Sequence, residues 1–298
     1  MSCHPVCDRR TFLVTSAMMA AATACGAGPG STGSTDPSPT PRVLVAAFPD
    51  GFLQPSVLTA GSPQRLVFVV DDGVDTMRET APEELLIRVV EDGTTVAEEM
   101  VERRSEGIIT PYYPMVLAVD RPGRFEASLP GHPEVAAVPF LVVDSDEVTL
   151  PTIGETLPAI ETPTLDDALG VDPLCTRAVP CPFHEHSFAE VAANGRPTAL
   201  LIATPGFCQT DICGPVVDLL IDELAAAGRD DIDAIHAEVY VDPSVFETGA
   251  FPDLTPLVAA VDLPFEPVLF VLDGRGTVAA RLDLTFDRRE LRDALGLV

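Results

Sequence analysis

The sequence predicts a chain with two folded domains, an all-β domain followed by an α/β domain. Residues 43–144 alternate short apolar runs with turn residues and show no long helical period, which favours strands. Residues 175–298 alternate strand-like and helix-like patterns instead. A length of 298 residues and an apolar content of 46% are enough for two domains with cores of their own.

The charge balance excludes one class of partner. The chain carries 18 basic and 46 acidic side chains, so its formal net charge is −28 at pH 7. Such a chain repels phosphate backbones, and we therefore expect no nucleic-acid partner.

Residues 1–25 have the pattern of an export signal. Arg9 and Arg10 stand shortly before a Phe-Leu pair, which resembles the twin-arginine motif of exported bacterial proteins. Residues 11–24 are uncharged, but at about 1.5 Å per helical residue they are too short to span a hydrocarbon core about 30 Å thick. A signal peptide fits this pattern better than a membrane-spanning helix.

The signal ends in a pattern that resembles a lipobox, the site at which a cysteine is acylated and becomes the new N-terminus. Residues 22–26 read Ala-Thr-Ala-Cys-Gly, with alanine at 22 where leucine is commonest. Residues 26–42 are rich in Gly, Pro, Ser and Thr, which predicts a flexible tether. We expect lipidation at Cys25 and anchoring to the outer face of the cytoplasmic membrane, an ordinary cleaved signal being the alternative.

Residues 43–144 are predicted to form a small immunoglobulin-like sandwich. Asp92-Gly93 is a strong hairpin signal, and Pro122-Gly123 marks a second turn before the run 124–129. Several short strands at this spacing are typical of a sandwich. Such a fold carries no function by itself, so we expect a spacer or an interaction module. The other apolar runs are residues 43–48, 65–70, 85–90, 115–119 and 136–143.

Two pairs of side chains in this domain are candidate surface features. Tyr112-Tyr113 lies between two prolines and is either an exposed binding strip or, as we expect, part of an edge or a solvated turn. Arg103-Arg104 either binds an anion or, as we expect, is likewise part of an edge or a solvated turn.

Residues 145–174 separate the two domains. They contain four prolines, short acidic stretches and no aromatic residue. This composition predicts an extended connector that leads into the second domain.

The order of its elements predicts the α/β domain, residues 175–298. An apolar strand at 198–204 leads through a turn into a helix that has Pro215 in its first turn and ends at Gly228. Asp287 and Glu290 form a capping box that opens the last helix. The other elements are strands at 235–241, 268–272 and 277–284 and a helix at 254–261. The order is therefore β-α-β-α-β-β-α.

Two cysteines stand at the first strand-to-helix junction, where residues 207–215 read Phe-Cys-Gln-Thr-Asp-Ile-Cys-Gly-Pro. With the element order, this junction resembles the thioredoxin fold over residues 197–298, and Cys208 and Cys213 occupy the active-site position. Glu266-Pro267 stands where thioredoxin-like proteins carry a cis-proline that faces that site. The chain is similar to thioredoxin-domain lipoproteins of high-GC bacteria.

The resemblance implies thiol–disulfide exchange with client proteins, an electron donor that reduces the cysteine pair, and no cofactor. A helix N-terminus stabilises a thiolate, and the thiolate is the form that attacks a disulfide. Cys208 is therefore the expected nucleophile and Cys213 the resolving cysteine. Pro267 is expected to shape the substrate groove beside them.

The spacing of this pair departs from that of thioredoxins, which have two intervening residues where this chain has four. Two cysteines five positions apart in a regular helix have Cα atoms about 8.6 Å apart, beyond the roughly 7 Å that a disulfide spans. Cys208 must therefore lie outside the helix, or the first turn must unwind. Gly206, Gly214 and Pro215 are expected to position the loop and the helix start.

Three other functions remain open at this stage. In the first, Cys208 and Cys213 form a fixed disulfide, and the thioredoxin-like module only binds a partner. A peroxiredoxin-like peroxidase shares the four-residue spacing, but it has Thr or Ser three residues before the nucleophile, where this chain has Pro205. A Sco-like copper protein needs a distant histidine, and beyond Cys213 the sequence offers only His236, which in a predicted strand is typical of a packed core residue.

Cys175 and Cys181 are predicted to form a structural disulfide, an auxiliary redox pair being the alternative. The segment from Cys181 to His186 also has the residue types of a zinc or copper site. No second dense cluster in the sequence completes such a site, so we expect no metal. His184, His186 and His236 remain its candidate ligands.

Overall fold

The computed structural model describes residues 40–47, 57–207 and 212–298. Residues 39–298 belong to one compact unit. The predicted export and lipidation residues Arg9, Arg10 and Cys25 lie outside the described residues, as does Cys208. Within the described ranges, no helix is both long enough and apolar enough to cross a membrane.

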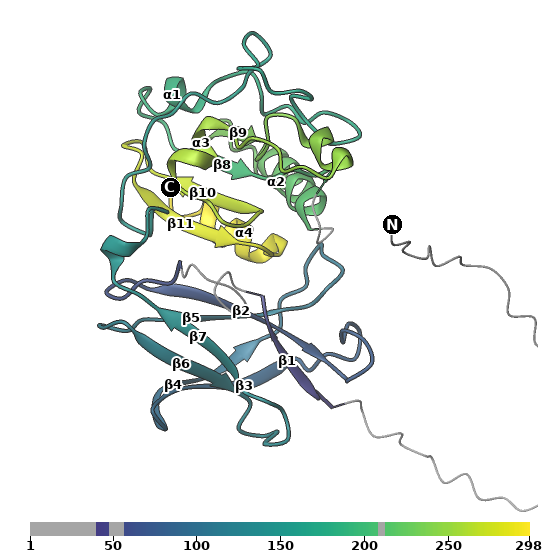
Figure 1. The fold of residues 1–298 in the computed structure, drawn as a ribbon, viewed down its shortest axis with the longest axis vertical. Coiled ribbons are helices and arrows are strands. Elements are labelled where there is room, and N and C mark those ends of the chain that lie inside the picture. The colour runs from purple at the N-terminus through teal and green to yellow at the C-terminus, as the bar shows by residue number, and fades with distance from the viewer. Residues whose placement is uncertain (1–39, 48–56, 208–211) are drawn as a thin grey trace, which may run out of the picture. The chain divides into compact units, whose positions relative to one another are not determined.

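The first domain consists of two antiparallel sheets around one hydrophobic core (Figure 1). One sheet has the strand order β1-β2-β5 and the other β4-β3-β6-β7. Phe68, Ile87 and Phe125 come from both sheets and are buried in the same cluster. The strands are β1 (Val43–Ala46), β2 (Gln64–Asp71), β3 (Glu84–Glu91), β4 (Thr94–Glu102), β5 (Tyr113–Leu117), β6 (Gly123–Ser128) and β7 (Val138–Val142). This arrangement is a β-sandwich, and its immunoglobulin-like character stays a prediction.

The hairpin between β3 and β4 turns at Asp92-Gly93, as the sequence predicts. Both residues have left-handed backbone angles, with φ of 48° and 77°, which the tight hairpin turns require. Alternate positions of β3 are buried, so one face of the strand meets the core.

The second domain is built on a four-stranded sheet with the order β11-β10-β8-β9 (Figure 1). Strands β8 (Thr198–Ile202) and β9 (Asp233–Ala237) are parallel, whereas β10 (Val268–Leu272) is antiparallel to both β8 and β11 (Val278–Asp283). Its helices are α1 (Phe188–Val191), α2 (Cys213–Ala227), α3 (Pro256–Ala260) and α4 (Arg288–Leu295). From β8 onward the predicted order β-α-β-α-β-β-α is confirmed.

Helices cover both faces of this sheet, so the sequences of its central strands are almost entirely apolar. Every residue of β8 and of β10 is buried. Ala199 and Leu201 belong to the cluster that contains α2 and α4 residues, whereas Leu200 and Ile202 belong to the cluster with α3. A strand covered on both faces cannot show the alternation of a half-exposed one.

The register of β8 brings three chain segments to one edge of the sheet. Ile202, the last residue of β8, pairs with Val268 at the start of β10 and with Ala237 at the end of β9. Strand β9 ends at Ala237, four residues before the predicted end at 241. Beyond this point the Val239 N–H donates to the Thr204 hydroxyl (3.1 Å) and not to a backbone carbonyl of a neighbouring strand. Thr204, Glu238 and Glu266 stand one or two residues beyond these paired ends.

The predicted connector, residues 145–174, packs against the second domain. After a short 3₁₀ helix at Ser145–Glu147, the Gly154 N–H donates to the Val278 carbonyl (2.9 Å) and the Leu157 N–H to the Gly276 carbonyl (3.0 Å). Leu150 and Leu157 are buried in the core cluster of that domain. The connector is irregular in structure, as expected, but it lies along the edge of the fold.

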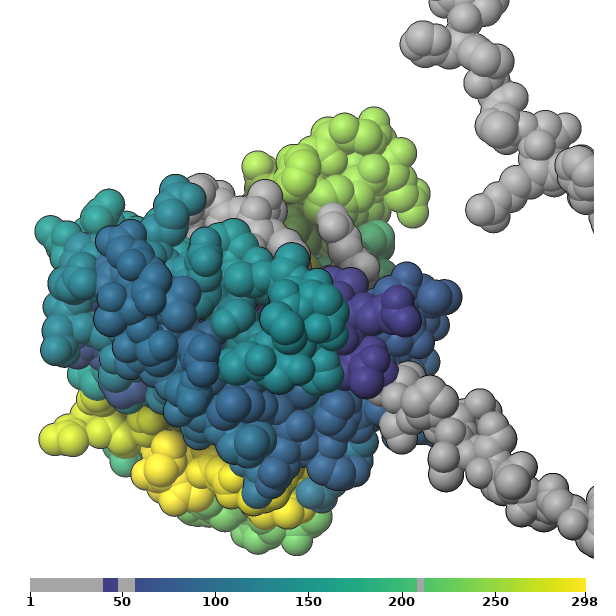
Figure 2. Space-filling model, turned by 90° about the horizontal axis from the view of Figure 1, so that it is seen from below, coloured from purple at the N-terminus to yellow at the C-terminus, as the bar shows by residue number. Residues whose placement is uncertain are grey.

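A buried polar cluster joins the two domains. Arg65 of β2 holds both carboxylate oxygens of Glu290 in α4, at 2.6 and 2.7 Å, and the Tyr112 hydroxyl donates to the same carboxylate. Tyr113 begins β5, which is an edge strand as expected, but both rings are fully buried, so neither a solvated turn nor an exposed binding strip is correct. Figure 2 shows the yellow C-terminal segment lying against the blue strands of the sandwich.

The same cluster changes the predicted capping box of α4. Asp287 is the N-cap, as expected, and accepts from the Glu290 N–H (2.8 Å). However, the Asp287 N–H donates to the Tyr112 hydroxyl (2.8 Å), while the Glu290 carboxylate turns to Arg65. The second oxygen of Asp287 accepts the backbone N–H groups of Ser105 (3.0 Å) and Glu106 (2.9 Å). The cap of one domain is thus completed by the other.

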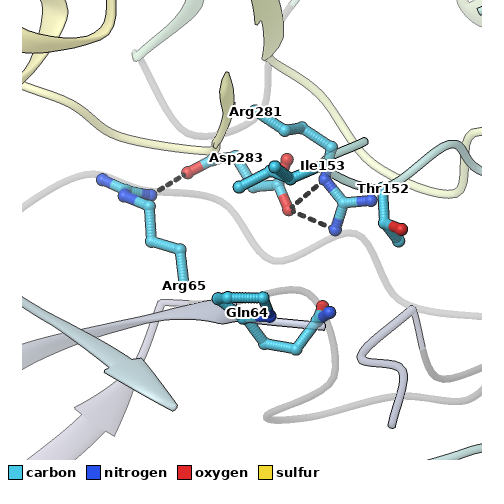
Figure 3. A pocket seen from close by; sticks show the side chains of 7 residues that line it. Gln64, Arg65, Thr152, Ile153, Arg281 and Asp283 are labelled. Atoms are coloured by element: carbon cyan, nitrogen blue, oxygen red, sulfur yellow. Dashed lines mark hydrogen bonds and ion pairs between the residues drawn. The ribbon is translucent and has the colours of Figure 1, made fainter. Parts of the chain in front are cut away.

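A small pocket lies beside this cluster, between β2, the connector and β11. Figure 3 shows the guanidinium of Arg281 pointing at the carboxylate of Asp283, with Arg65 on the far side of that residue. The Arg65 side chain donates to the Asp283 carbonyl (2.8 Å), and the Arg281–Asp283 ion pair is buried. The charged side chains that line this pocket, Arg65, Arg281 and Asp283, each have an ion-pair partner, although Oδ1 of Asp283 accepts no hydrogen bond from the described residues.

We expect Glu290→Gln to lower the free energy of unfolding by about 3–5 kcal/mol, because Arg65 would remain buried without its counter-ion. Burial opposes ionisation of Glu290, but the Arg65 charge together with the hydrogen bonds from Arg65 and Tyr112 outweighs it, so the pKa of this carboxyl lies below its ordinary value. The ionised Glu290 carboxylate therefore stabilises the folded protein at neutral pH, and this stabilisation is lost as pH falls below about 4. Urea unfolding at pH 7 and at lower pH measures both effects.

The matched control is Glu98→Gln in the exposed Arg88–Glu98 pair, where both side chains are more than a third exposed. We expect a loss under about 1 kcal/mol there. Equal losses in the two variants would contradict the assigned role of the Arg65–Glu290 pair.

Candidate functional site

Helix α2 begins at Cys213, at the junction that the sequence singled out. The Cys213 side chain is fully buried and its sulfur is in a disulfide. Pro215 lies in the first turn and Gly228 ends the helix with a φ of 61°, both as predicted. The helix begins at Cys213 and no earlier, while Cys208 lies outside the described residues, so its pairing with Cys213 stays a prediction.

Glu266 brings a carboxyl group to this cysteine. Its Oε2 lies 3.7 Å from the Cys213 sulfur and accepts the Thr204 N–H. Burial raises the pKa of the Glu266 carboxyl above its ordinary value. The following peptide bond, to the buried Pro267, is cis, as the resemblance led us to expect. Sequence reasoning noted Glu266 only as the neighbour of Pro267, since no local signal links it to Cys213.

The loop before α2 rests on the segment that carries Cys175. The Gly206 N–H donates to the Thr176 hydroxyl (2.9 Å), and the Thr176 N–H donates to the buried Glu238 carboxylate (2.6 Å). Burial raises the pKa of Glu238 to about 8. A Cβ at Gly206 would lie 2.7 Å from the Thr176 carbonyl oxygen, so this position needs glycine for space. Gly214 has no such neighbour.

The predicted disulfide between Cys175 and Cys181 is not formed, and both cysteines are free. Their sulfurs turn instead toward two histidines. The Cys181 sulfur lies 3.3 Å from Nε2 of His184 and 3.3 Å from Nδ1 of His236, and the Cys175 sulfur lies 3.8 Å from the same Nδ1. Hydrogen bonding between the two sulfurs lowers the pKa of the Cys175 thiol and raises that of Cys181.

His236 joins these cysteines from β9. It is buried, as expected of a core residue in a strand, but its ring is oriented by polar contacts. Nε2 lies 3.0 Å from the Ala203 carbonyl oxygen, and Nδ1 lies 3.3 Å from Nε2 of His184. The third candidate, His186, is exposed and stands outside the group. The sequence could not reveal this group because 52 positions separate His184 from His236.

Two alternative functions fare poorly on this geometry. A Sco-like site would need His236 beside Cys213, yet its Nδ1 faces Cys175 and Cys181. A peroxiredoxin-like site has Thr or Ser three residues before the nucleophile, whereas this chain has Pro205 there, and the Thr204 hydroxyl is fully buried and accepts the Val239 N–H.

No family model matches the chain, and no curated protein matches it. Among solved structures, it matches the crystal structure of a thiol:disulfide interchange protein, a thioredoxin family protein from Chlorobium tepidum TLS. The match has 13% identity and a TM-score of 0.32, and it covers 49% of this chain and 97% of that one. The thioredoxin-like assignment rests on the element order and sheet order given above.

We expect Gly206→Ala to destabilise the protein by about 1–3 kcal/mol, because the added methyl group would press on the Thr176 backbone. Gly214→Ala is the matched control in the same segment. With open space around it and a better helix former in place, it should be neutral or stabilising by up to about 1 kcal/mol. Chemical denaturation compares the two, and a Gly206→Ala variant as stable as the control would show that the Thr176 contact is not tight.

Proposed function

We propose that this protein is an exported, lipid-anchored thiol–disulfide oxidoreductase that acts on protein disulfides through Cys208 and Cys213. The observation that carries the proposal is the environment of Cys213. A buried, disulfide-bonded cysteine stands at the N-terminus of α2 and faces the carboxyl group of Glu266. The twin-arginine-like and lipobox-like patterns, with Cys25 as the acylated residue, support export and anchoring.

The exchange proceeds by two displacements at sulfur. In the reducing direction the Cys208 thiolate attacks one sulfur of the client disulfide, so a mixed disulfide forms and the client's other sulfur leaves as a thiolate. Cys213 then attacks the Cys208 sulfur, which releases the second client thiolate and closes the 208–213 disulfide. A dithiol donor on the outer side of the membrane restores the reduced pair. The same steps in reverse oxidise a client.

Glu266 is suited to handle the proton of Cys213. A buried thiol attacks slowly unless a base removes its proton, and Oε2 of Glu266 lies 3.7 Å from this sulfur. Because burial raises the pKa of Glu266, this carboxyl changes charge closer to neutral pH than an exposed glutamate does. Pro267, next to it in the chain, would border the groove for the client peptide.

We expect the 208–213 pair to have a midpoint potential between about −120 and −270 mV, the range of known oxidoreductases. Glutathione titration of the full chain with mass spectrometry of the alkylated thiols measures it. A midpoint well below about −300 mV would instead indicate a fixed disulfide in a binding module.

Substitution of each cysteine separates the two roles. Cys208→Ser should abolish exchange, whereas Cys213→Ser should accumulate a mixed disulfide with the client. A Cys213→Ser variant that turns over normally, or a Cys208→Ser variant that forms mixed disulfides, would overturn the role assignment.

We expect Glu266→Gln to slow resolution of the mixed disulfide by about a hundredfold at pH values above the Glu266 pKa, since the amide accepts no proton. Below that pKa the wild-type carboxyl is itself protonated, so the two proteins should converge. Stopped-flow rates measured against pH test this, with Glu185→Gln, an exposed acidic side chain, as the control. A uniform reduction at every pH would indicate a structural effect rather than proton transfer.

A further inference from the structure

The group of thiols and imidazoles around His236 has no part in the exchange described above. Its four donor atoms, the sulfurs of Cys175 and Cys181, Nε2 of His184 and Nδ1 of His236, all lie within 4.8 Å of one another. All four side chains are buried, with relative exposures between 1% and 9%. We propose that they form a closed, tetrahedral zinc site.

The distances between the donor atoms match those around a tetrahedral zinc ion. With Zn–S bonds of about 2.3 Å and Zn–N bonds of about 2.05 Å, a regular tetrahedron places sulfur and nitrogen about 3.6 Å apart and two nitrogens about 3.3 Å apart. The observed S–N distances are 3.3, 3.3 and 3.8 Å, and the N–N distance is 3.3 Å. These four of the six donor–donor distances lie within about 0.3 Å of those in a zinc-sized tetrahedron, and the other two are at most 4.8 Å.

The surroundings of His236 prepare its ring for metal binding. Nε2 lies 3.0 Å from the Ala203 carbonyl, which only accepts hydrogen bonds, so Nε2 carries the ring hydrogen. Nδ1 of the neutral ring is then a bare lone pair that points at the other three donors. A carbonyl that fixes the tautomer in this way is a regular partner of metal-bound histidine.

The neighbouring backbone supports the cysteines as ligands. The Cys181 N–H points at the Cys175 sulfur (3.5 Å), a contact that favours a thiolate. Residues 181–184 supply two ligands with two residues between them, a common spacing in zinc sites. The backbone N–H of His236 also donates to the Phe183 carbonyl (3.0 Å), so this short segment is hydrogen-bonded to β9.

Charge selects zinc among the metals that such donors bind. The two negative charges of the thiolates, with two neutral imidazoles, offset the charge of a divalent cation, and a neutral site is the least costly to bury. Cu⁺ in the same site would leave one uncompensated negative charge. Calcium and magnesium prefer oxygen ligands. Four protein donors complete the coordination of zinc, which is typical of a structural rather than a catalytic site.

The site would fix the segment on which the exchange loop rests. Thr176 follows the ligand Cys175 directly, and its hydroxyl accepts the Gly206 N–H. The bound ion would therefore hold residues 175–184 against β9 and, through Thr176, support the loop before α2. Zinc binding itself does not depend on whether the 208–213 pair exchanges disulfides.

The test is the metal content of the full chain, purified with a thiol reductant and without chelator. We expect about one zinc per chain by inductively coupled plasma mass spectrometry. After zinc removal, Co²⁺ should bind and show the strong visible and thiolate-to-metal absorption of tetrahedral cobalt with sulfur ligands. The cobalt spectrum is measured on the unmutated chain, so it does not depend on how well variants fold.

The variants distinguish ligands from packing residues. Cys181→Ser and His184→Ala should each lower bound zinc to below about a tenth of an equivalent, whereas His186→Ala, in the same segment but exposed, should retain it. His184→Cys should also retain zinc, because three cysteines and one histidine are a regular zinc set. A reduced chain that binds neither zinc nor cobalt, copper in place of zinc, or a Cys175–Cys181 disulfide in the purified protein would overturn the proposal.

Discussion

The register of β8 between its two neighbours is the constraint on which the rest of the second domain depends. Ile202 pairs with the first residue of β10 and with the last of β9, so three chain segments meet where β8 ends. Thr204, Glu266 and Glu238 all stand one or two residues beyond these paired positions. A shift of one residue would turn the buried side chains of β8 to the opposite face and separate Glu266 from Cys213. Every residue of β8 and of β10 is buried, so the packing of particular side chains on both faces, and not a polar–apolar alternation, must hold that register.

The two domains share polar groups that neither could bury alone. Glu290 and Asp287 of α4 satisfy Arg65, the Tyr112 hydroxyl and two backbone N–H groups near Ser105. Buried charges of this kind are tolerated when every partner is present. The sandwich is thus more than a spacer on a flexible linker: it completes the cap of the last helix, and the connector hydrogen-bonds along β11.

Two cysteine pairs in one small domain are distinguished by what surrounds them. Cys213 stands at a helix N-terminus beside a carboxyl group, an environment for a sulfur that changes its bonding partner. Cys175 and Cys181 face two imidazole nitrogens, an environment for sulfurs that hold a cation. The short spacing of Cys175 and Cys181 predicts a loop disulfide. The structure differs because the direction in which each side chain points cannot be predicted from the sequence. Thr176 links the two environments through Gly206 and Glu238.

The sequence by itself determined what depends on neighbours along the chain. The strand and helix order, the Asp92-Gly93 hairpin, Pro215 in the first turn of α2, the Gly228 cap and the Asp287 cap all follow from local backbone preferences, and the structure has each of them. Tertiary structure alone decided the burial of Tyr112, the partner of Glu290, the approach of Glu266 to Cys213 and the meeting of His184 with His236. Each of these joins residues that are tens of positions or more apart, and such contacts are set by strand register and domain packing, which leave no periodic signal in the sequence.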